Sequence, residues 1–211
     1  PVNGKCARSQ LMSVRDCQSI TKKAIVERLR GRYRTDWFVE DAETVSIDVA
    51  LHGDIAQLTL DASGTALNRR GYRTWNGEAP LRETLAAALV TLSPWRPGMP
   101  LHDPMCGTGT LMIEAAMRMA HRAPGLTREF AIESWRNMPT EAFGDIREQA
   151  RAEFDPSRIE GISGSDIDPE AVELANRHLK QAGLAGRVRF ETADMRDCRR
   201  AEPQGVFLCN P

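Results

Sequence analysis

The stretch of sequence that decides the fold is Leu101-His102-Asp103-Pro104-Met105-Cys106-Gly107-Thr108-Gly109-Thr110-Leu111-Met112. It indicates the end of a buried strand, a carboxylate at the carboxyl edge of that strand, a turn with two glycines, and a helix from Thr110 to about Arg122. Glycine can adopt a positive φ angle and lets a ligand approach the backbone, while free N–H groups at a helix N-terminus favour polar or anionic groups. The stretch therefore predicts a ligand-binding turn; a tight βα turn without a ligand is the alternative.

Two common nucleotide-binding motifs do not fit this turn. A dinucleotide fingerprint needs a third small residue three positions after the second glycine, and an acidic residue about 20 residues onward. Met112 holds the third position, and the next strand-end acid, Asp166, lies far beyond that spacing. A P-loop needs Gly-Lys-Ser/Thr, which does not follow. What remains is a turn suited to an amino-acid-bearing nucleoside, with Asp103 placed to meet an ammonium group.

The turn and the motifs that follow it resemble a known family. Asp103–Thr110 is similar to the first cofactor motif of S-adenosylmethionine-dependent RNA methyltransferases that carry a THUMP domain. Gly164–Pro169 resembles their second motif, Asp194-Met195 their third, and Asn210-Pro211 the opening of their Asn-Pro-Pro-Tyr catalytic motif. Within that family the resemblance is nearest to the L half of bacterial large-subunit ribosomal RNA methyltransferases of the K/L type, which act on the N2 amine of guanine. Further similar segments are 70–73, 79–89 and 123–126.

The resemblance implies an α/β fold in two parts. Residues 1–75 would be the C-terminal part of an α+β THUMP domain, whose first part is expected to be absent from this sequence. Residues 76–211 would be the cofactor-binding half of a Rossmann-like class I methyltransferase domain, with an insertion at about 121–157.

The resemblance also implies roles for the strand-end carboxylates. Asp103 would lie beside the methionine ammonium of S-adenosylmethionine, and Asp166 would accept hydrogen bonds from the ribose hydroxyls. Asp194 would accept from the adenine amine, with the backbone N–H of Met195 donating to the ring. Asp168 is explained equally well as a helix cap. The full set of expected cofactor contacts is Asp103, Met105, Cys106, Gly107, Thr108, Gly109, Thr110, Asp166, Ile167, Asp168, Asp194 and Met195.

Asn210 and Pro211 are the expected catalytic residues. In the resembled family this motif accepts the two N–H bonds of the target's exocyclic amine, which holds the nitrogen in line with the sulfonium methyl group. Positioning of this kind can lower the barrier by roughly 7–11 kcal/mol. The second proline and the aromatic residue of the motif do not follow in this sequence, so the chain by itself is expected not to methylate.

The N-terminal segment carries a local positive charge. Residues 1–40 hold nine basic and four acidic side chains. Apolar residues at helical spacing predict an amphipathic helix from about Ser19, or as early as Ser9, to Arg32. Alternation over 45–51 and 56–60 predicts a β-hairpin. Residues expected to contact RNA are Lys22, Lys23, Arg28, Arg30 and Arg32 on the helix, and Arg70, Tyr72 and Arg73 after the hairpin.

Each of these basic segments also has a simpler interpretation. Basic side chains on a helix are often just a solvated face. The segment around Tyr72 could be an interdomain turn that this tyrosine pins in place, rather than a surface for phosphate contact and base stacking.

The remaining elements follow a βα order. The pattern predicts a helix that begins near Pro80 and ends before Ser93, a helix at Pro169–Ala182, and strands at Ile159–Ser165, Val188–Glu191 and Val206–Cys209. In open α/β sheets, ligands bind at the carboxyl ends of such strands.

Composition excludes several classes of protein. The chain has 211 residues, 41% of them hydrophobic, which is enough to bury one good core. Its net charge of −1 gives no global indication of nucleic-acid binding. It has no apolar run of about 18 residues and no signal-peptide layout, which favours a cytoplasmic protein without membrane contact. The five cysteines lack Cys-x-x-Cys spacing, so neither a disulfide framework nor a metal site is expected. The oligomeric state stays open.

These observations converge on one function with three alternatives. The expected reaction is methyl transfer from S-adenosylmethionine to the N2 amine of a guanine in 23S ribosomal RNA. A tRNA guanine-N2 methyltransferase and an adenine-N6 methyltransferase are the enzymatic alternatives, because the Asn-Pro-Pro-Tyr motif serves any exocyclic amine. An RNA-binding fragment without turnover is the third.

Overall fold

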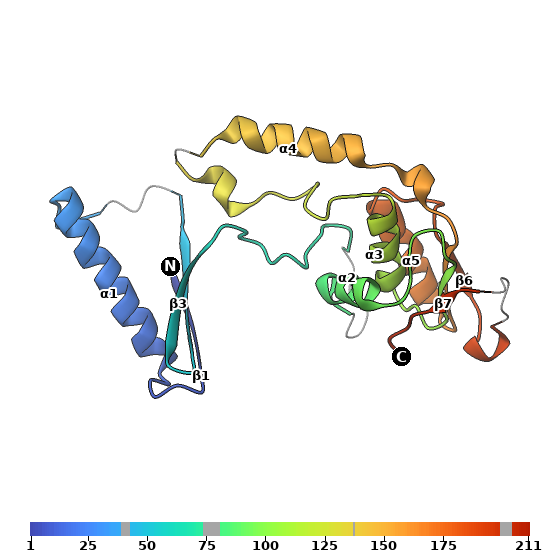
Figure 1. Ribbon diagram of the computed structural model, residues 1–211, viewed down its shortest axis with the longest axis horizontal. Helices are drawn as coiled ribbons and strands as arrows, with labels where there is room; N and C mark the ends of the chain where they lie inside the picture. The colour runs from blue at the N-terminus through green and yellow to red at the C-terminus, as the bar shows by residue number, and fades with distance from the viewer. Residues whose placement is uncertain (39–42, 74–80, 137, 199–203) are drawn as a thin grey trace. The chain divides into compact units, whose positions relative to one another are not determined.

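The computed structural model describes residues 1–38, 43–73, 81–136, 138–198 and 204–211. The chain divides into two compact units (Figure 1). The first unit comprises Pro1–Thr65 with Glu129–Thr140, and the second comprises Ala66–Arg128 with Glu141–Pro211. Part of the expected insertion thus belongs to the first unit, and the segment just after residue 65 belongs to the second.

The first unit is a three-stranded sheet with one long helix. Its elements are β1 (Val2–Ala7), α1 (Val14–Tyr33), β2 (Ser46–His52) and β3 (Ile55–Asp61). The strand order is β1-β2-β3, with β1 parallel to β2 and β2 antiparallel to β3. The predicted hairpin is confirmed, whereas β1 was not predicted. Helix α1 begins between the two proposed starts, because the Ser13 hydroxyl accepts a hydrogen bond from the Asp16 N–H and caps it there.

Close packing joins α1 to β1. A Cβ atom added to Gly4 would lie 2.9 Å from Gln18 Cγ, so the glycine lets the helix approach the strand. The thiols of Cys6 and Cys17 lie 3.5 Å apart across the same contact, and both cysteines are free.

The second unit contains a four-stranded parallel sheet. Its elements are α2 (Glu83–Leu92), β4 (Leu101–Asp103), α3 (Thr110–Met119), α4 (Thr140–Glu153, of which Thr140 lies in the first unit), β5 (Ile162–Asp166), α5 (Pro169–Gln181), β6 (Arg189–Thr192) and β7 (Val206–Phe207). The strand order is β6-β5-β4-β7, and every pair is parallel. The chain moves outward from β4 through β5 to β6 and then returns to place β7 on the other side of β4. The carboxyl end of β4 is therefore the topological switch point, where such sheets bind ligands.

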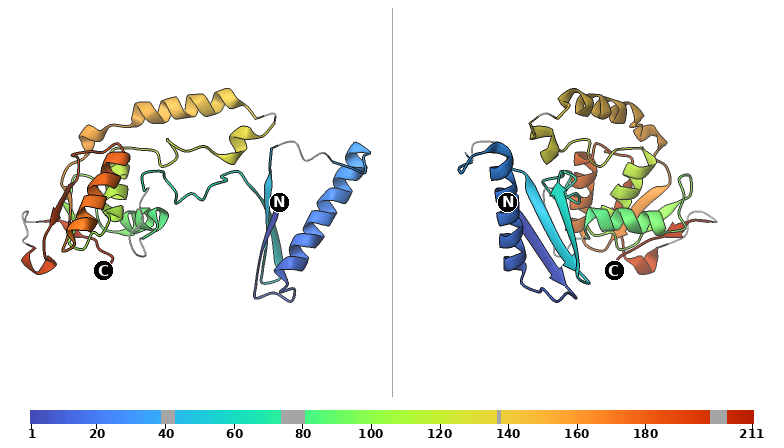
Figure 2. Two further views of the ribbon diagram at one scale, coloured as in Figure 1. Left: turned by 180° about the vertical axis from the view of Figure 1, so that it is seen from behind. Right: turned by 60° about the vertical axis from the view of Figure 1, so that its left-hand side comes forward.

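The core of this unit lies between the sheet and its helices. Helices α3 and α5 contact each other and both contact β5, so they cover one face, and α2 packs on α3 (Figure 2). Met112 and Ile113 of α3 are fully buried. Burial of a side chain of this size stabilises a fold by roughly 1.5–3 kcal/mol. The residue that replaces the third glycine of a dinucleotide motif is therefore part of the core.

Several predicted boundaries shift by a few residues. Helix α3 ends at Met119 instead of Arg122, because His121 adopts a left-handed φ of 53°. The N–H of Arg122 then donates to the Met117 carbonyl at 2.8 Å, which closes the helix in a Schellman motif. Strand β5 begins at Ile162 instead of Ile159, and the predicted helix start near Pro80 lies outside the described residues. Within the described part of the chain, no helix has both the length and the apolar character needed to cross a membrane.

Candidate functional site

The two glycines of the β4–α3 turn are needed for different reasons. Gly107 and Gly109 have positive φ angles of 51° and 78°. A Cβ atom on Gly109 would lie 2.8 Å from Phe190 Cζ and 2.9 Å from Ala175 Cβ, so this glycine allows α3 to start close to β6 and α5. A Cβ atom on Gly107 would meet nothing within 4 Å. The backbone at Gly107 is therefore open to a ligand.

Two carboxylates hold the turn. Asp166, at the end of β5, accepts hydrogen bonds from the N–H of Gly107 at 2.8 Å and from the N–H of Asp168 at 3.0 Å. Asp103, at the end of β4, is only 2% exposed and accepts from the N–H of Met105 at 3.1 Å. Burial raises the pKa of Asp103 to about 7, and the charge of Asp166 adds to the rise while the bond from Met105 opposes it. A cation in the cavity would restore the charged form of Asp103.

A cavity of about 580 Å³ opens beside this turn at the carboxyl ends of the strands. Its volume falls in the range of small-molecule sites. The expected residues that line it are Asp103, Met105, Cys106, Gly107, Thr108, Thr110, Asp166, Asp168, Asn210 and Pro211. The expected cofactor turn and the expected catalytic pair, about a hundred residues apart in sequence, therefore share one cavity.

Residues 70–211 match the family described as the RMKL-like methyltransferase domain. The chain belongs to this family. A Bacillus subtilis protein named "Putative RNA methyltransferase YpsC" is 40% identical over 100% of this chain and 55% of its own length. The chain thus spans about half the length of the curated relatives it matches.

Solved structures agree with this assignment. A protein from Listeria monocytogenes described as a "predicted N6-adenine-specific DNA methylase" is 40% identical, with a TM-score of 0.93, and is covered over 56% of its chain. A second structure, SMU.472, described as "a putative methyltransferase complexed with SAH" (S-adenosylhomocysteine), is 36% identical with a TM-score of 0.90. Each aligns with 100% of this chain, and the second is again covered over 56% of its own.

Five residues of this RMKL-like methyltransferase chain line the cavity without having been expected. They come from the segment just before α2, from α3 and from the first turns of α5, and they are Leu81, Leu111, Glu170, Ala171 and Leu174. The spacing of the three on α5 places them on one helix face. This helical spacing, just after the strand-end carboxylate Asp166, is the feature of the sequence from which they could have been predicted.

Four expected cofactor contacts do not line the cavity of this methyltransferase domain. Gly109 serves packing, and Ile167 is 68% exposed. The Asp194 carboxylate accepts from the backbone N–H of Arg196 at 2.9 Å and from its guanidinium, which lowers the pKa of Asp194 to about 2. Met195 is 50% exposed. A local pair two residues apart therefore holds the acid that was expected to meet adenine.

The expectation of RNA contact by Arg70, Tyr72 and Arg73 is corrected by their burial. Tyr72 is 3% exposed and its hydroxyl donates to Glu114 Oε1 at 3.0 Å. Arg70 Nε lies 2.9 Å from the same oxygen, and Arg73 donates to the Thr110 hydroxyl at 2.8 Å. A buried carboxylate such as Glu114 is costly unless it is paired, so this segment is held against α3 instead of facing a polynucleotide.

The basic residues of α1 are exposed. Lys22, Lys23, Arg28, Arg30 and Arg32 all lie at the surface, and Arg30 pairs with Glu27 at 3.2 Å. Contact between these residues and RNA stays a prediction.

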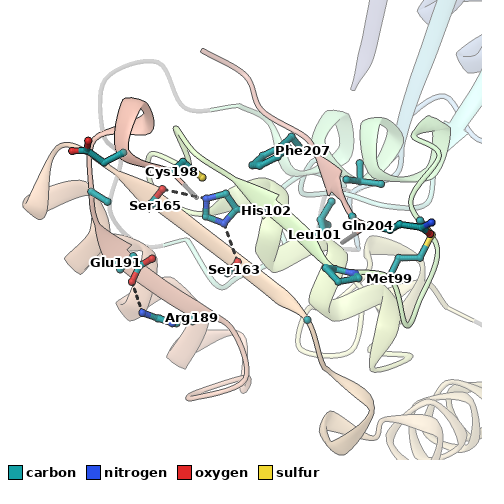
Figure 3. A pocket seen from close by; sticks show the side chains of 16 residues that line it. Met99, Leu101, His102, Ser163, Ser165, Arg189, Glu191, Cys198, Gln204 and Phe207 are labelled. Carbon is teal, nitrogen blue, oxygen red and sulfur yellow. Dashed lines mark hydrogen bonds and ion pairs between the residues drawn. The ribbon is translucent and has the colours of Figure 1, made fainter. Parts of the chain in front are cut away.

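A second and larger hollow, of about 890 Å³, lies against the sheet of the methyltransferase domain (Figure 3). His102 hydrogen-bonds there to the hydroxyls of Ser163 at 2.9 Å and Ser165 at 3.3 Å. Phe207 packs edge-on against the His102 ring. Side chains alternate between the faces of a strand, so this is the face opposite α3 and α5. Parallel sheets are normally covered by other segments on both faces. We therefore interpret this hollow as a surface for packing of protein and not as a ligand site.

The described residues contain no group of three or more His, Cys, Asp or Glu side chains that could hold a metal ion.

Proposed function

We propose that this protein transfers a methyl group from S-adenosylmethionine to the exocyclic N2 amine of a guanine in 23S ribosomal RNA, in the cytoplasm. The observation that carries the proposal is that Asn210 and Pro211 line the same cavity as the glycine turn and Asp103. A cofactor held by the turn and an amine held by Asn210 would then meet within one space. Membership of a methyltransferase family and the S-adenosylhomocysteine complex of a relative support this reading.

The residues present fit S-adenosylmethionine, which supplies an electrophilic methyl group on a sulfonium. Asp103 is buried and accepts a hydrogen bond from the Met105 N–H, and burial raises its pKa to about 7, so its charged form is left short of stabilising partners that an ammonium group would supply. We assign it to the methionine ammonium. Asp166, at the edge of the cavity, would accept from the ribose hydroxyls, since a carboxylate oxygen can take more than one donor. The open backbone at Gly107 would let the amino-acid part approach closely.

Asn210 would accept a hydrogen bond from the target amine and orient it. It follows β7, whose pairing to β4 continues through the Leu208 N–H donating to the His102 carbonyl at 3.1 Å. Through this pairing Asn210 follows a strand that lies next to the one carrying Asp103, which supports its proposed role. Orientation of two reactants in this way can account for several orders of magnitude in rate.

We further propose that the first unit contributes RNA contact, as the C-terminal part of a THUMP domain over residues 1–75. The exposed basic residues of α1 are suited to phosphates, which fix a polynucleotide without reading its sequence. The name of the Bacillus relative supports RNA as the substrate, whereas the description of the Listeria protein points to adenine in DNA. The identity of the methylated base separates these readings.

Methylated nucleosides in RNA from cells with and without the gene test the proposal. We expect one N2-methylguanine of 23S ribosomal RNA to disappear with the gene and to return when it is supplied on a plasmid. A plasmid copy carrying Asn210→Ala should fail to restore it at equal protein levels. Loss of a methyl group from tRNA, or of N6-methyladenine, would overturn the assignment of the target. Restoration by the Asn210→Ala copy would overturn the role of Asn210.

A further inference from the structure

The Arg73 side chain joins two segments of the second unit. Its guanidinium Nη2 donates to the Leu81 carbonyl at 2.7 Å and to the Thr110 hydroxyl at 2.8 Å. Its Nε lies 3.6 Å from Glu83 Oε1, and both side chains of this ion pair are less than a tenth exposed. The charge of Arg73 is thus buried together with a carboxylate, while its planar end is used for hydrogen bonds.

Both hydrogen-bond acceptors of Arg73 belong to the cofactor cavity. Leu81 and Thr110 line it, and Arg73 does not. Thr110 is the first residue of α3 and follows the glycine turn directly, and Leu81 stands just before α2. Arg73 therefore fixes one side of the cavity from behind, at the helix N-terminus where the backbone N–H groups are free to meet a ligand.

The neighbouring residues Arg70 and Tyr72 do something different. They bond to Glu114 in the middle of α3, which does not line the cavity. The segment 70–73 thus has two separate buried anchors, one to the body of α3 and one to the side of the cavity. Loss of the first should affect stability alone, and loss of the second should affect stability and ligand binding.

We propose that Arg73 is a positioning residue for S-adenosylmethionine, acting through Thr110 and the Leu81 carbonyl without touching the ligand. This inference rests on the proposed use of that cofactor. Nη2 donates to both acceptors while Nε, a separate nitrogen of the planar guanidinium, stands beside Glu83. A lysine carries all its donors on one nitrogen at the end of a shorter side chain, so it cannot meet Leu81, Thr110 and Glu83 together.

Titration of the purified protein with S-adenosylhomocysteine by calorimetry, together with thermal unfolding of the ligand-free protein, tests this proposal. Arg73→Lys keeps a charge beside Glu83 but loses the hydrogen bonds to Leu81 and Thr110, so its unfolding temperature should fall and its Kd should rise about tenfold. The matched control, Arg70→Met, breaks the ion pair to Glu114 and should lower the unfolding temperature while leaving the Kd unchanged. Equal Kd values for Arg73→Lys and the wild type would overturn the positioning role.

A double-mutant cycle gives a readout that a purely structural role would not move. Thr110→Val removes the acceptor hydroxyl. If Arg73 acts through it, the Kd of Arg73→Lys/Thr110→Val should rise by less than the product of the two single increases. A fully multiplicative increase would overturn the coupling. Wild-type protein that does not bind S-adenosylhomocysteine at all would instead overturn the proposed cofactor, so the two failures are distinguishable.

Discussion

Asp103 and Cys106 stand three residues apart in the wall of the cavity, and burial raises the pKa of both groups. The consequences differ, because an acid whose pKa is raised to about 7 is partly protonated near neutral pH, whereas a thiol with a raised pKa only becomes less reactive. A cationic ligand would therefore change the charge of Asp103, whereas the neighbouring Cys106 thiol stays unreactive.

The pKa of Asp103 makes stability depend on pH. It is raised from 3.8 to about 7 in the folded protein. Since the folded protein holds this proton between those values and the unfolded chain does not, the free energy of unfolding should fall as pH rises from about 4 to about 7. Asp103→Asn should remove that fall, and should stabilise the ligand-free protein at pH 8 by roughly 2–4 kcal/mol. Urea unfolding of both proteins at pH 5 and pH 8 measures the difference, and identical pH dependence would contradict the assignment.

The same carboxylate should be required for binding. Asp103→Asn removes the charge that we assign to the methionine ammonium, so affinity for S-adenosylmethionine should fall while stability rises. A gain in both would show that Asp103 is unfavourable for the fold and unused by the ligand.

Cys106 should resist alkylation. Burial, followed by the charges of Asp103 and Asp166, raises its pKa to about 12. Against an ordinary thiol, this leaves roughly a thousandfold less thiolate at pH 8. Cys209 is exposed and provides the internal comparison. Mass spectrometry after iodoacetamide treatment should find Cys209 modified and Cys106 unmodified, with both modified in denaturant. Rapid modification of Cys106 in the native protein would contradict its burial.

Single residues of the site could be predicted from the sequence where their motif lies within a few consecutive residues. Asp103, Gly107 and Asp166 could be placed at the site because each follows or ends a strand. The role of Arg73 could not be predicted, because its partner Thr110 lies 37 residues away and only the fold brings them together. The contact of Asp194 with adenine stays a prediction, and its local pair with Arg196, two residues along the chain, could have been considered from the sequence.

At the scale of elements, substitutions in the β4–α3 turn test whether Gly109 is needed for packing and Gly107 for ligand access. Gly109→Ala meets both a left-handed backbone and a clash with Phe190, and should lower the free energy of unfolding by about 2–5 kcal/mol. Gly107→Ala meets only the backbone cost, about 1–2 kcal/mol, but should also weaken binding of S-adenosylhomocysteine. Urea unfolding and calorimetry on both variants distinguish them. Equal losses of stability would contradict the packing role of Gly109.

Strand β1 shows why some elements escape prediction. Its inward positions are Val2, Gly4 and Cys6, and a glycine and a cysteine give a weak apolar alternation. The strand is specified by its parallel pairing to β2, more than forty residues onward, and by the close approach of α1. By contrast, the hairpin of β2 and β3 has local pairing and regular alternation, and it was predicted correctly.

At the scale of the whole molecule, the sequence identified a parallel α/β sheet with a cofactor turn. It did not reveal that Glu129–Thr140 belongs to the first unit. Helical and strand periodicity report local environment, whereas membership of a unit depends on contacts between distant segments. One such contact is the Ile132 N–H donating to the Ala62 carbonyl at 3.1 Å, which no periodic pattern encodes.

The distribution of basic residues over the molecule predicts a salt-dependent affinity for RNA. Replacing Lys22, Lys23, Arg28, Arg30 and Arg32 with glutamine should weaken binding of ribosomal RNA. It should also reduce the slope of log affinity against log salt by roughly 0.7–0.9 for each phosphate that the protein no longer neutralises. Neutralising the exposed Arg177, Lys180 and Arg189 of the second unit is the control and should change neither. Filter binding at salt concentrations from about 50 to 200 mM measures both quantities. An unchanged slope for the α1 variant would mean that this face is only solvated.

The division of the two units has a consequence for the order of events during synthesis. The first unit needs Glu129–Thr140, which leaves the ribosome only after residues 66–128 have been made. At roughly 5–20 residues per second, the nascent sheet of β1, β2 and β3 must wait several seconds for the segment that completes it. During that interval β4 and α3 have already emerged and can begin to associate. The first unit is therefore complete only after part of the second unit has emerged, and the second unit, which extends to Pro211, is completed later still.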